Sequence, residues 1–174
     1  MTKKFNVEEI KQTKKTKRKF DDFVNYFIFI GPIGIAFIGF SMLFGYFKHN
    51  LDFLQLLISF IPISLGLLFA HFTLKRLNEN VTFETIENRN NLGLETLKQE
   101  IENTFRTNDI YIDKELELIE VMTKLTGFSW GEIITIIKDE NTYLVNSRPS
   151  ASSQPVTIYK DRKNINKIKK ILTQ

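Results

Sequence analysis

Side chains that commonly carry out catalysis are scarce in this sequence. It contains no cysteine and two histidines, His49 and His71. Glu115 and Glu117 are spaced to share one face of a strand, as catalytic carboxylates would be, but acidic residues that alternate along a strand usually form its solvated side. The sequence has no glycine-rich phosphate loop and no zinc-ligand spacing. Because an enzyme needs a convergent set of nucleophile, base or metal ligands, we predict that the protein is not an enzyme and binds no cofactor or metal.

Arg148 is a candidate for binding a phosphate or carboxylate group. It lies in residues 146–150 (NSRPS), and the composition of residues 147–155 is typical of a loop. An arginine beside hydroxyl groups in such a loop can bind an anion, although an ordinary surface arginine is the alternative. Trp130 beside Gly131 is interpreted as a core or strand-edge residue and not as a platform for a ligand.

The C-terminal segment is basic and follows an acidic region. Residues 79–140 contain 14 acidic and six basic residues, whereas residues 160–174 contain six basic residues and one acidic residue. Four lysines spaced to share one helix face are Lys160, Lys163, Lys167 and Lys170. With the N-terminal basic cluster, they can bind anionic lipid, where each charge near the surface contributes about 1 kcal/mol, less with added salt. Alternatively, these lysines neutralise the acidic region.

Two long apolar runs dominate the first half of the chain. Residues 23–47 are 25 residues without a formal charge, and residues 53–74 are 22 residues whose one titratable side chain is that of His71. About 20 helical residues cross the hydrocarbon core of a bilayer, and a helix satisfies its own backbone hydrogen bonds there. The short connection 48–52 predicts two transmembrane helices in an antiparallel hairpin.

The distribution of positive charge predicts the orientation of this hairpin. Segment 1–22 is basic and the connecting loop has one lysine, Lys48, so both termini are expected in the cytoplasm. The first apolar run is too long for a cleavable signal peptide. The bias toward Lys, Asn, Ile and Phe is typical of AT-rich bacterial genomes. We therefore predict a multi-pass protein of a bacterial inner or plasma membrane.

Small residues form one stripe on each predicted span. The stripes are Gly31, Gly34, Ser41 and Gly45 on the first span and Ser59, Gly66, Ala70 and Thr73 on the second. Small faces allow helix backbones to approach closely in lipid, so these stripes predict the contact between the spans, with a homodimer interface as the alternative. The spans lack the paired ionisable groups of a transport pathway, and His71 is interpreted as an interfacial residue.

Residues 79–174 have the pattern of an α+β domain. Apolar alternation predicts strands at 81–87, 110–112, 115–124, 130–138, 142–146 and 156–159. Helical spacing predicts an early helix capped by Asn90 or Asn91 and a C-terminal helix capped by Asp161. The expected fold is therefore a membrane α-helical hairpin plus a mainly antiparallel sheet of about five strands with these two helices.

Residues 129–172 resemble part of a group of bacterial membrane proteins. In this region the sequence WGEII (130–134) precedes a hairpin and a closing helix, which is similar to two-transmembrane-helix proteins with a small cytoplasmic pleckstrin-homology-like domain. The resemblance implies a small barrel and supplies no catalytic residues. The early helix at 91–106 departs from a simple barrel, so a two-layer α+β sandwich stays open.

Two functions fit these observations. The first is a noncatalytic membrane-anchored cytoplasmic module that binds lipid headgroups or a protein partner. The second is a small structural subunit of a membrane transport or envelope complex, in which the hairpin is the working part. Exchanging the hairpin for an unrelated one would be tolerated in the first case and not in the second. Nucleic acid is not the expected partner, because the basic helix lacks exposed aromatic residues and a recognition motif.

Overall fold

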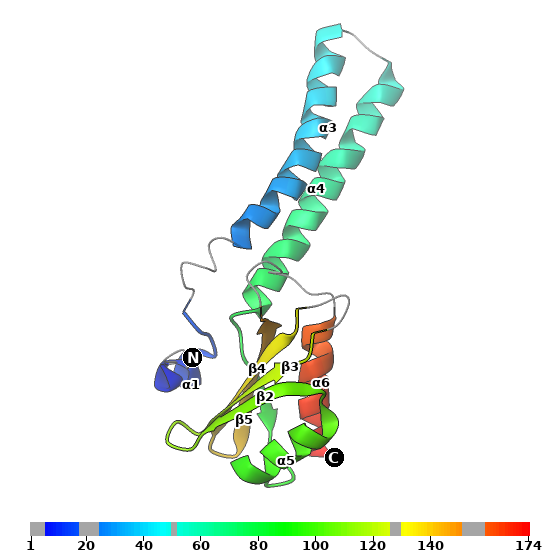
Figure 1. The fold of residues 1–174 in the computed structure, drawn as a ribbon. Helices are drawn as coiled ribbons and strands as arrows, with labels where there is room; N and C mark the ends of the chain where they lie inside the picture. Colours follow the sequence, from blue (N-terminus) through cyan, green and yellow to red (C-terminus); the bar gives the residue numbers. More distant parts are fainter. Residues whose placement is uncertain (1–5, 18–24, 50–51, 126–129, 151–158) are drawn as a thin grey trace. The chain divides into compact units, whose positions relative to one another are not determined.

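The computed structural model describes residues 6–17, 25–49, 52–125, 130–150 and 159–174, and these form two compact units. One is the two-helix unit, Phe20–Leu77, and the other is the sheet unit, which combines Met1–Lys19 with Asn78–Gln174. Figure 1 shows the elements of both units. The expected combination of two long apolar helices with an α+β domain is present, but the chain before the helices contributes to that domain.

The two-helix unit has the length and apolar character needed to cross a membrane. A short 3-10 helix, Asn25–Phe29, leads into α3 (Ile30–His49), and α4 is Phe53–Glu79. The mean hydropathy is 2.2 for both candidate spans. Their outward surfaces are rich in phenylalanine, leucine and isoleucine, and Phe37 and Phe44 are 69% and 70% exposed. Apolar surface of this extent in water is rare in soluble monomers.

The helices of this unit run antiparallel and touch at two glycines. A Cβ atom at Gly39 would lie 2.6 Å from Cγ1 of Ile63 and 2.7 Å from the carbonyl oxygen of Ser59. A Cβ atom at Gly66 would lie 2.8 Å from that of Ala36. All three distances are too short for a real Cβ atom. These two glycines therefore set how closely α3 and α4 approach each other.

The predicted small-residue stripe is correct in part on α4 and wrong on α3. On α4, Ser59 is fully buried and Gly66 makes the contact. On α3, by contrast, a Cβ atom at Gly31, Gly34 or Gly45 would have no neighbour within 4 Å. The α3 contact uses the face of Ala36 and Gly39 instead. Sequence spacing alone did not distinguish that face from the stripe.

The sheet unit is built on one antiparallel sheet. Its strands are β1 (Glu84–Glu87), β2 (Thr107–Asp113), β3 (Leu118–Thr123), β4 (Glu132–Asp139) and β5 (Thr142–Pro149). Their order is β1-β5-β4-β3-β2, and every neighbouring pair is antiparallel. The prediction of about five mainly antiparallel strands is confirmed.

Two helices cover one face of this sheet. They are α5 (Leu94–Thr104) and α6 (Lys160–Thr173) (Figure 1). Their apolar residues recur at helical spacing. Leu97 and Ile101 of α5 and Ile168 and Leu172 of α6 are fully buried in the core beneath them. The early and the C-terminal helix predicted from sequence are therefore present and form the main core with the sheet, although the N-cap of α5 is Gly93 and not Asn90 or Asn91.

A third helix, α1 (Val7–Thr13), lies on the opposite face of the sheet. Its side chains Val7 and Ile10 pack in a second apolar cluster with Phe83, Leu118, Ile137 and Leu144. Ile10 is 2% exposed. The sequence predicted residues 1–22 only as a basic cytoplasmic segment that sets topology, so this structural role of α1 was missed.

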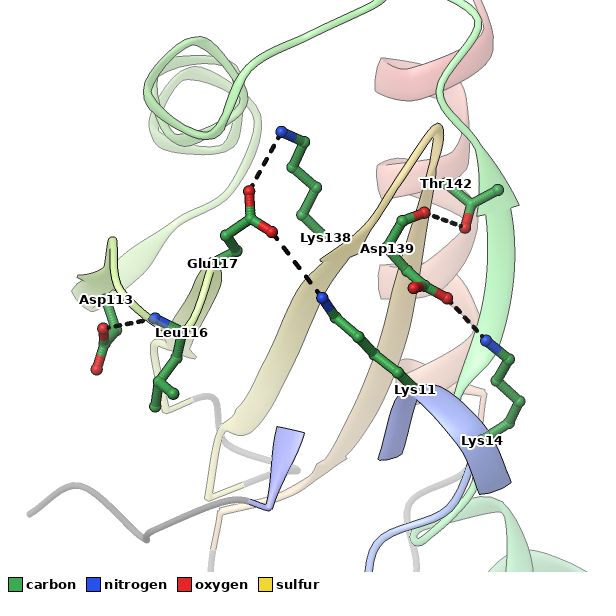
Figure 2. Close-up of polar contacts among 8 residues, drawn as sticks. All are labelled: Lys11, Lys14, Asp113, Leu116, Glu117, Lys138, Asp139 and Thr142. Atoms are coloured by element: carbon green, nitrogen blue, oxygen red, sulfur yellow. Dashed lines mark hydrogen bonds and ion pairs between the residues drawn. The ribbon is translucent and has the colours of Figure 1, made fainter. Parts of the chain in front are cut away.

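Hydrogen bonds and ion pairs fix α1 in place. The amide of Phe83 donates to the carbonyl oxygen of Lys14 over 2.8 Å. Figure 2 shows Nζ of Lys11 reaching Oε2 of Glu117 at 3.9 Å and Nζ of Lys14 reaching Oδ2 of Asp139 at 2.9 Å. Surface ion pairs contribute about 0–1 kcal/mol each, whereas a fully buried aliphatic side chain contributes about 1.5–3 kcal/mol. The apolar contacts therefore stabilise α1 more than its lysines do.

Two element predictions near the C-terminus need correction. Strand β5 continues to Pro149, so residues 147–149 are paired with β4 and are not a loop. Tyr159, predicted to end a last strand, has a φ of 62° and is the N-cap of α6, and Asp161 lies in the first turn instead of capping it. The rest of that predicted strand, 156–158, lies outside the described residues.

The first prediction concerns the buried face of α1. Ile10→Ala removes a side chain that is 2% exposed and should lower the free energy of unfolding of the sheet unit by about 2–5 kcal/mol. Gln12→Ala, at an exposed position of the same helix, should change it by less than about 0.5 kcal/mol. Pulse proteolysis of the full chain in detergent across a urea series measures both. Equal stability of the two variants would show that α1 does not support the sheet.

The second prediction concerns the contact between α3 and α4. Gly39→Leu places a side chain where Ile63 and Ser59 already lie within 3 Å, so the hairpin should unfold at a lower concentration of sodium dodecyl sulfate. Gly34→Leu, where a Cβ atom has no neighbour within 4 Å, is the matched control and should not lower it. Far-UV circular dichroism follows both titrations. A change in oligomeric state with Gly34→Leu would instead indicate the homodimer interface.

Candidate functional site

The structure does not bring the five predicted anion contacts together at one site. Lys160, Lys163, Lys167 and Lys170 all belong to α6, as predicted. Lys163 and Lys170 are exposed, whereas Lys160 and Lys167 are half-buried. Lys160 and Lys163 lie in the first turns of the helix and Lys170 in its last turn. At a rise of about 1.5 Å per residue, the two ends of this lysine row are about 15 Å apart.

Lys167 contributes to packing within the sheet unit. Its Nζ atom donates to the carbonyl oxygen of Thr104 over 3.3 Å and lies 4.8 Å from the ring centroid of Phe105. A cation at this distance over an aromatic face is attracted by the ring. Lys167 thus joins α6 to the end of α5, and its ammonium group is less available to an external anion than that of Lys163.

Arg148 lies on the other face of the sheet from α6. Successive side chains of a strand point to opposite faces, and the neighbouring Ser147 points toward α6, where its Oγ accepts a hydrogen bond of 3.1 Å from Nδ2 of Asn164. Arg148 is opposite Ile133 of β4 and is half-buried. The structure therefore does not bring Arg148 together with the lysines of α6.

A cleft of about 500 Å³ lies where β1, β5 and the start of α6 meet. Its charged lining residues are Glu79, Glu84, Asp161 and Arg162. Nη2 of Arg162 donates to Oε1 of Glu79 over 2.7 Å, and this hydrogen bond with the attraction of the carboxylate raises the pKa of Arg162. Three carboxylates and one guanidinium disfavour an anion, so this junction cleft is not the phosphate site that the basic segment suggested.

Asn146 fixes the chain between α4 and β1 beside this cleft. Its side chain is 2% exposed, and its Nδ2 group donates to the carbonyl oxygens of Glu79 and Thr82 over 3.1 and 2.6 Å. Sequence reasoning placed Asn146 at the end of a hairpin and gave it no role. Its partners are about 65 residues away along the chain, and no local pattern identifies such contacts.

Glu115 and Glu117 do not share a strand face, because both precede β3 in the turn after β2. Glu117 has a φ of 49°. Its carboxylate accepts a hydrogen bond of 3.3 Å from Nζ of Lys138 and also pairs with Lys11 (Figure 2). The predicted strand 115–124 begins at Leu118, so the arrangement of a catalytic carboxylate pair is absent here.

Trp130 is on the surface of the sheet unit. It lies two residues before β4, and its side chain is 62% exposed, so of the two interpretations, core or strand-edge residue, the core position is wrong. The described residues contain no group of three or more His, Cys, Asp or Glu side chains that could hold a metal ion.

Comparison of the chain with protein-family models, with curated proteins and with solved structures found no match.

The third prediction concerns Asn146. Asn146→Ala leaves the carbonyl oxygens of Glu79 and Thr82 without their donor and should cost about 1–3 kcal/mol of stability. Asn146→Asp should cost more at neutral pH, because the new carboxylate would face two carbonyl oxygens. Since protonation restores a donor, the pKa of that carboxyl should be raised and part of the loss recovered as the pH falls.

Pulse proteolysis at two pH values measures these stabilities in the full chain. Asn103→Ala, at an exposed position of α5, is the control and should leave the stability unchanged. An Asn146→Asp variant that is as stable as the wild type at neutral pH would contradict the role assigned to Asn146.

Proposed function

We propose that the protein is a noncatalytic binding module that is anchored in a membrane by its two-helix unit. In this proposal α3 and α4 cross the bilayer as a hairpin, and the sheet unit lies on the cytoplasmic side. There it binds an anionic lipid surface or a protein partner through exposed side chains.

The observation that carries this proposal is the composition of the sheet unit. Residues before the two-helix unit and residues after it fold together, with α1 covering the face of the sheet opposite α5 and α6. A chain that enters and leaves the bilayer from one folded unit must have both ends of its hairpin on one side. This agrees with the lysine distribution, which favours the cytoplasm for both termini.

The exposed apolar surface of α3 and α4 supports insertion of the hairpin in lipid. Side chains such as those of Phe37, Phe44 and Leu67 are more than 60% exposed. Burial in hydrocarbon is worth about 25 cal/mol per Å² of apolar surface, so a bilayer stabilises a surface that water would not.

A binding role is supported by the sheet unit itself. Residues 78–174 contain no histidine and no cysteine, and Glu117, one of the two carboxylates that were candidates for acid–base chemistry, pairs with Lys11 and Lys138. Its exposed basic and aromatic side chains are groups that can recognise a charged surface.

The fourth prediction tests the sidedness of the chain. Because the sequence has no cysteine, single substitutions can be labelled without background. In intact cells, a membrane-impermeant maleimide should label Asp52→Cys, which lies between the helices. It should label Gln12→Cys and Gln174→Cys, both in the sheet unit, only after the cells are permeabilised.

The pair in the sheet unit serves as its own control, since both positions are exposed and must behave alike. Reaction of Gln12→Cys and Gln174→Cys from different sides would contradict one folded unit on one side. Protection of Asp52→Cys in intact cells together with free reaction of the other two would reverse the orientation. Equal reaction of all three before and after permeabilisation would show that the hairpin does not cross a membrane.

A further inference from the structure

Three of the exposed large apolar side chains of the sheet unit stand apart by their exposure. Leu125, Trp130 and Tyr159 are 58%, 62% and 68% exposed, whereas Tyr111 and Met122 are each 42% exposed. Two of the three are aromatic residues with a polar group. Exposure of their apolar surface to water is unfavourable in free energy unless another surface covers it.

The segments that carry Leu125 and Trp130 meet at one end of the sheet. There β3 ends and β4 begins, and the amide of Glu132 donates to Oγ1 of Thr123 over 2.9 Å. The end of β5 joins them, because Oγ of Ser150 donates to the carbonyl oxygen of Trp130 over 2.6 Å.

The start of α6 lies at the same end. Asn164 bonds to Ser147 near the end of β5, whereas Leu172, in the last turn of the helix, accepts a hydrogen bond of 3.2 Å from the amide of Asn90. The helix therefore runs opposite to β5. Tyr159 lies more than one turn before Asn164. It is therefore beyond Ser147, toward the end of the sheet where β3 ends and β4 begins.

This end carries lysine side chains as well as exposed aromatic side chains. We define the aromatic–basic end by its described surface residues Lys124, Leu125, Trp130, Tyr159, Lys160 and Lys163. The opposite end of the sheet contains the acidic segments 113–117 and 139–140. Glu117 and Asp139 of these segments form ion pairs with Lys11 and Lys14. The junction cleft, with Glu79, Glu84 and Asp161, borders this same end at the start of α6, so the positive charge beside the exposed aromatic side chains is that of Lys124, Lys160 and Lys163.

The chain that follows the apolar helix enters the sheet unit near this end. Glu79, the last residue of α4, pairs with Arg162 in the first turn of α6 and bonds through its carbonyl oxygen to Asn146, next to Ser147. Leu74, where the apolar segment ends, precedes Glu79 by five residues.

We infer that the aromatic–basic end is a contact surface for an anionic lipid leaflet. Tryptophan and tyrosine prefer the level of the headgroups, where the ring is in an apolar region and the polar group in water. Lysine near an anionic surface is attracted electrostatically within about one Debye length. This inference rests on the proposed function, and it selects lipid over protein as the partner of this surface and assigns residues to it.

The inference also changes which lysines matter. Lys160 and Lys163 belong to the contact, whereas Lys167 packs on Phe105 and Lys170 lies at the far end of α6. Arg148 lies on the other face of the sheet and is not included. The uniform basic face suggested by sequence spacing is therefore replaced by one end of the helix together with Lys124, Leu125 and Trp130, which flank β3 and β4.

Trp130 is the single tryptophan of the chain, so its fluorescence reports on this surface directly. The full chain is reconstituted in vesicles of phosphatidylcholine and in vesicles that also contain phosphatidylglycerol. In the anionic vesicles the emission of Trp130 should shift to shorter wavelength and be quenched by brominated lipid, and high salt should reverse both effects. Brominated lipid reports on both orientations of the protein in the vesicle.

A pair of double variants separates the two ends of α6. Lys160→Glu with Lys163→Glu should abolish the shift and the quenching in anionic vesicles. Lys169→Glu with Lys170→Glu makes the same change in net charge on the same helix and should retain both. Leu125→Ser, which changes no charge, should reduce the quenching. Circular dichroism of every variant confirms that the fold is kept.

The outcomes distinguish this inference from the function on which it rests. If the cysteine labelling places the hairpin across the membrane and Trp130 emits as in water with both lipids, the surface assignment is overturned while the anchored module stands, and a protein partner becomes the alternative. If both double variants lose the emission shift and the quenching to the same extent, the surface assignment is also overturned, because net charge alone would then explain binding. If the hairpin does not cross the membrane, both proposals fail.

Discussion

Packing of α1 against the second face of the sheet is the contact on which the architecture depends. Consecutive residues in the central strands are buried on opposite faces, as Ile136 and Ile137 show, so the sheet needs a cover on each side. The chain after the two-helix unit supplies α5 and α6 for one face. The other is covered by Val7 and Ile10, which precede that unit. The hairpin is consequently an insertion within the chain of the sheet unit.

Local patterns predicted most of the elements, because each carries its own periodicity. The uncharged run 23–47 and the helical spacing of Leu97 and Ile101 required no knowledge of distant residues. The role of α1 was missed, since the lysines around it were explained by topology alone. A signal was nevertheless present: the isoleucine-rich segment 133–137 (IITII) is typical of a strand buried on both faces. Such a strand implies a second cover, which the predicted domain 79–174 did not contain.

The candidate site was less predictable than the fold for a physical reason. Spacing predicts which lysines share a helix face, but it does not show that the ammonium group of Lys167 packs over the ring of Phe105. Residues 146–150 have the composition of a loop, yet most of this segment pairs with β4, and the alternation of the strand turns Arg148 away from α6. The exposure of Trp130 likewise depends on which segments pack beside it. These are tertiary properties, and one-dimensional patterns do not contain them.

The contact that closes the fold also changes the charge at one end of the sheet unit. An acidic domain tethered close to an anionic leaflet would be repelled by it. Lys11 of α1 and Lys14, its C-cap, pair with Glu117 and Asp139 at one end of the sheet, which offsets part of the acidic charge there. The apolar packing of α1 therefore has an electrostatic consequence, because it brings two lysines to the acidic end of the sheet and reduces the negative charge there.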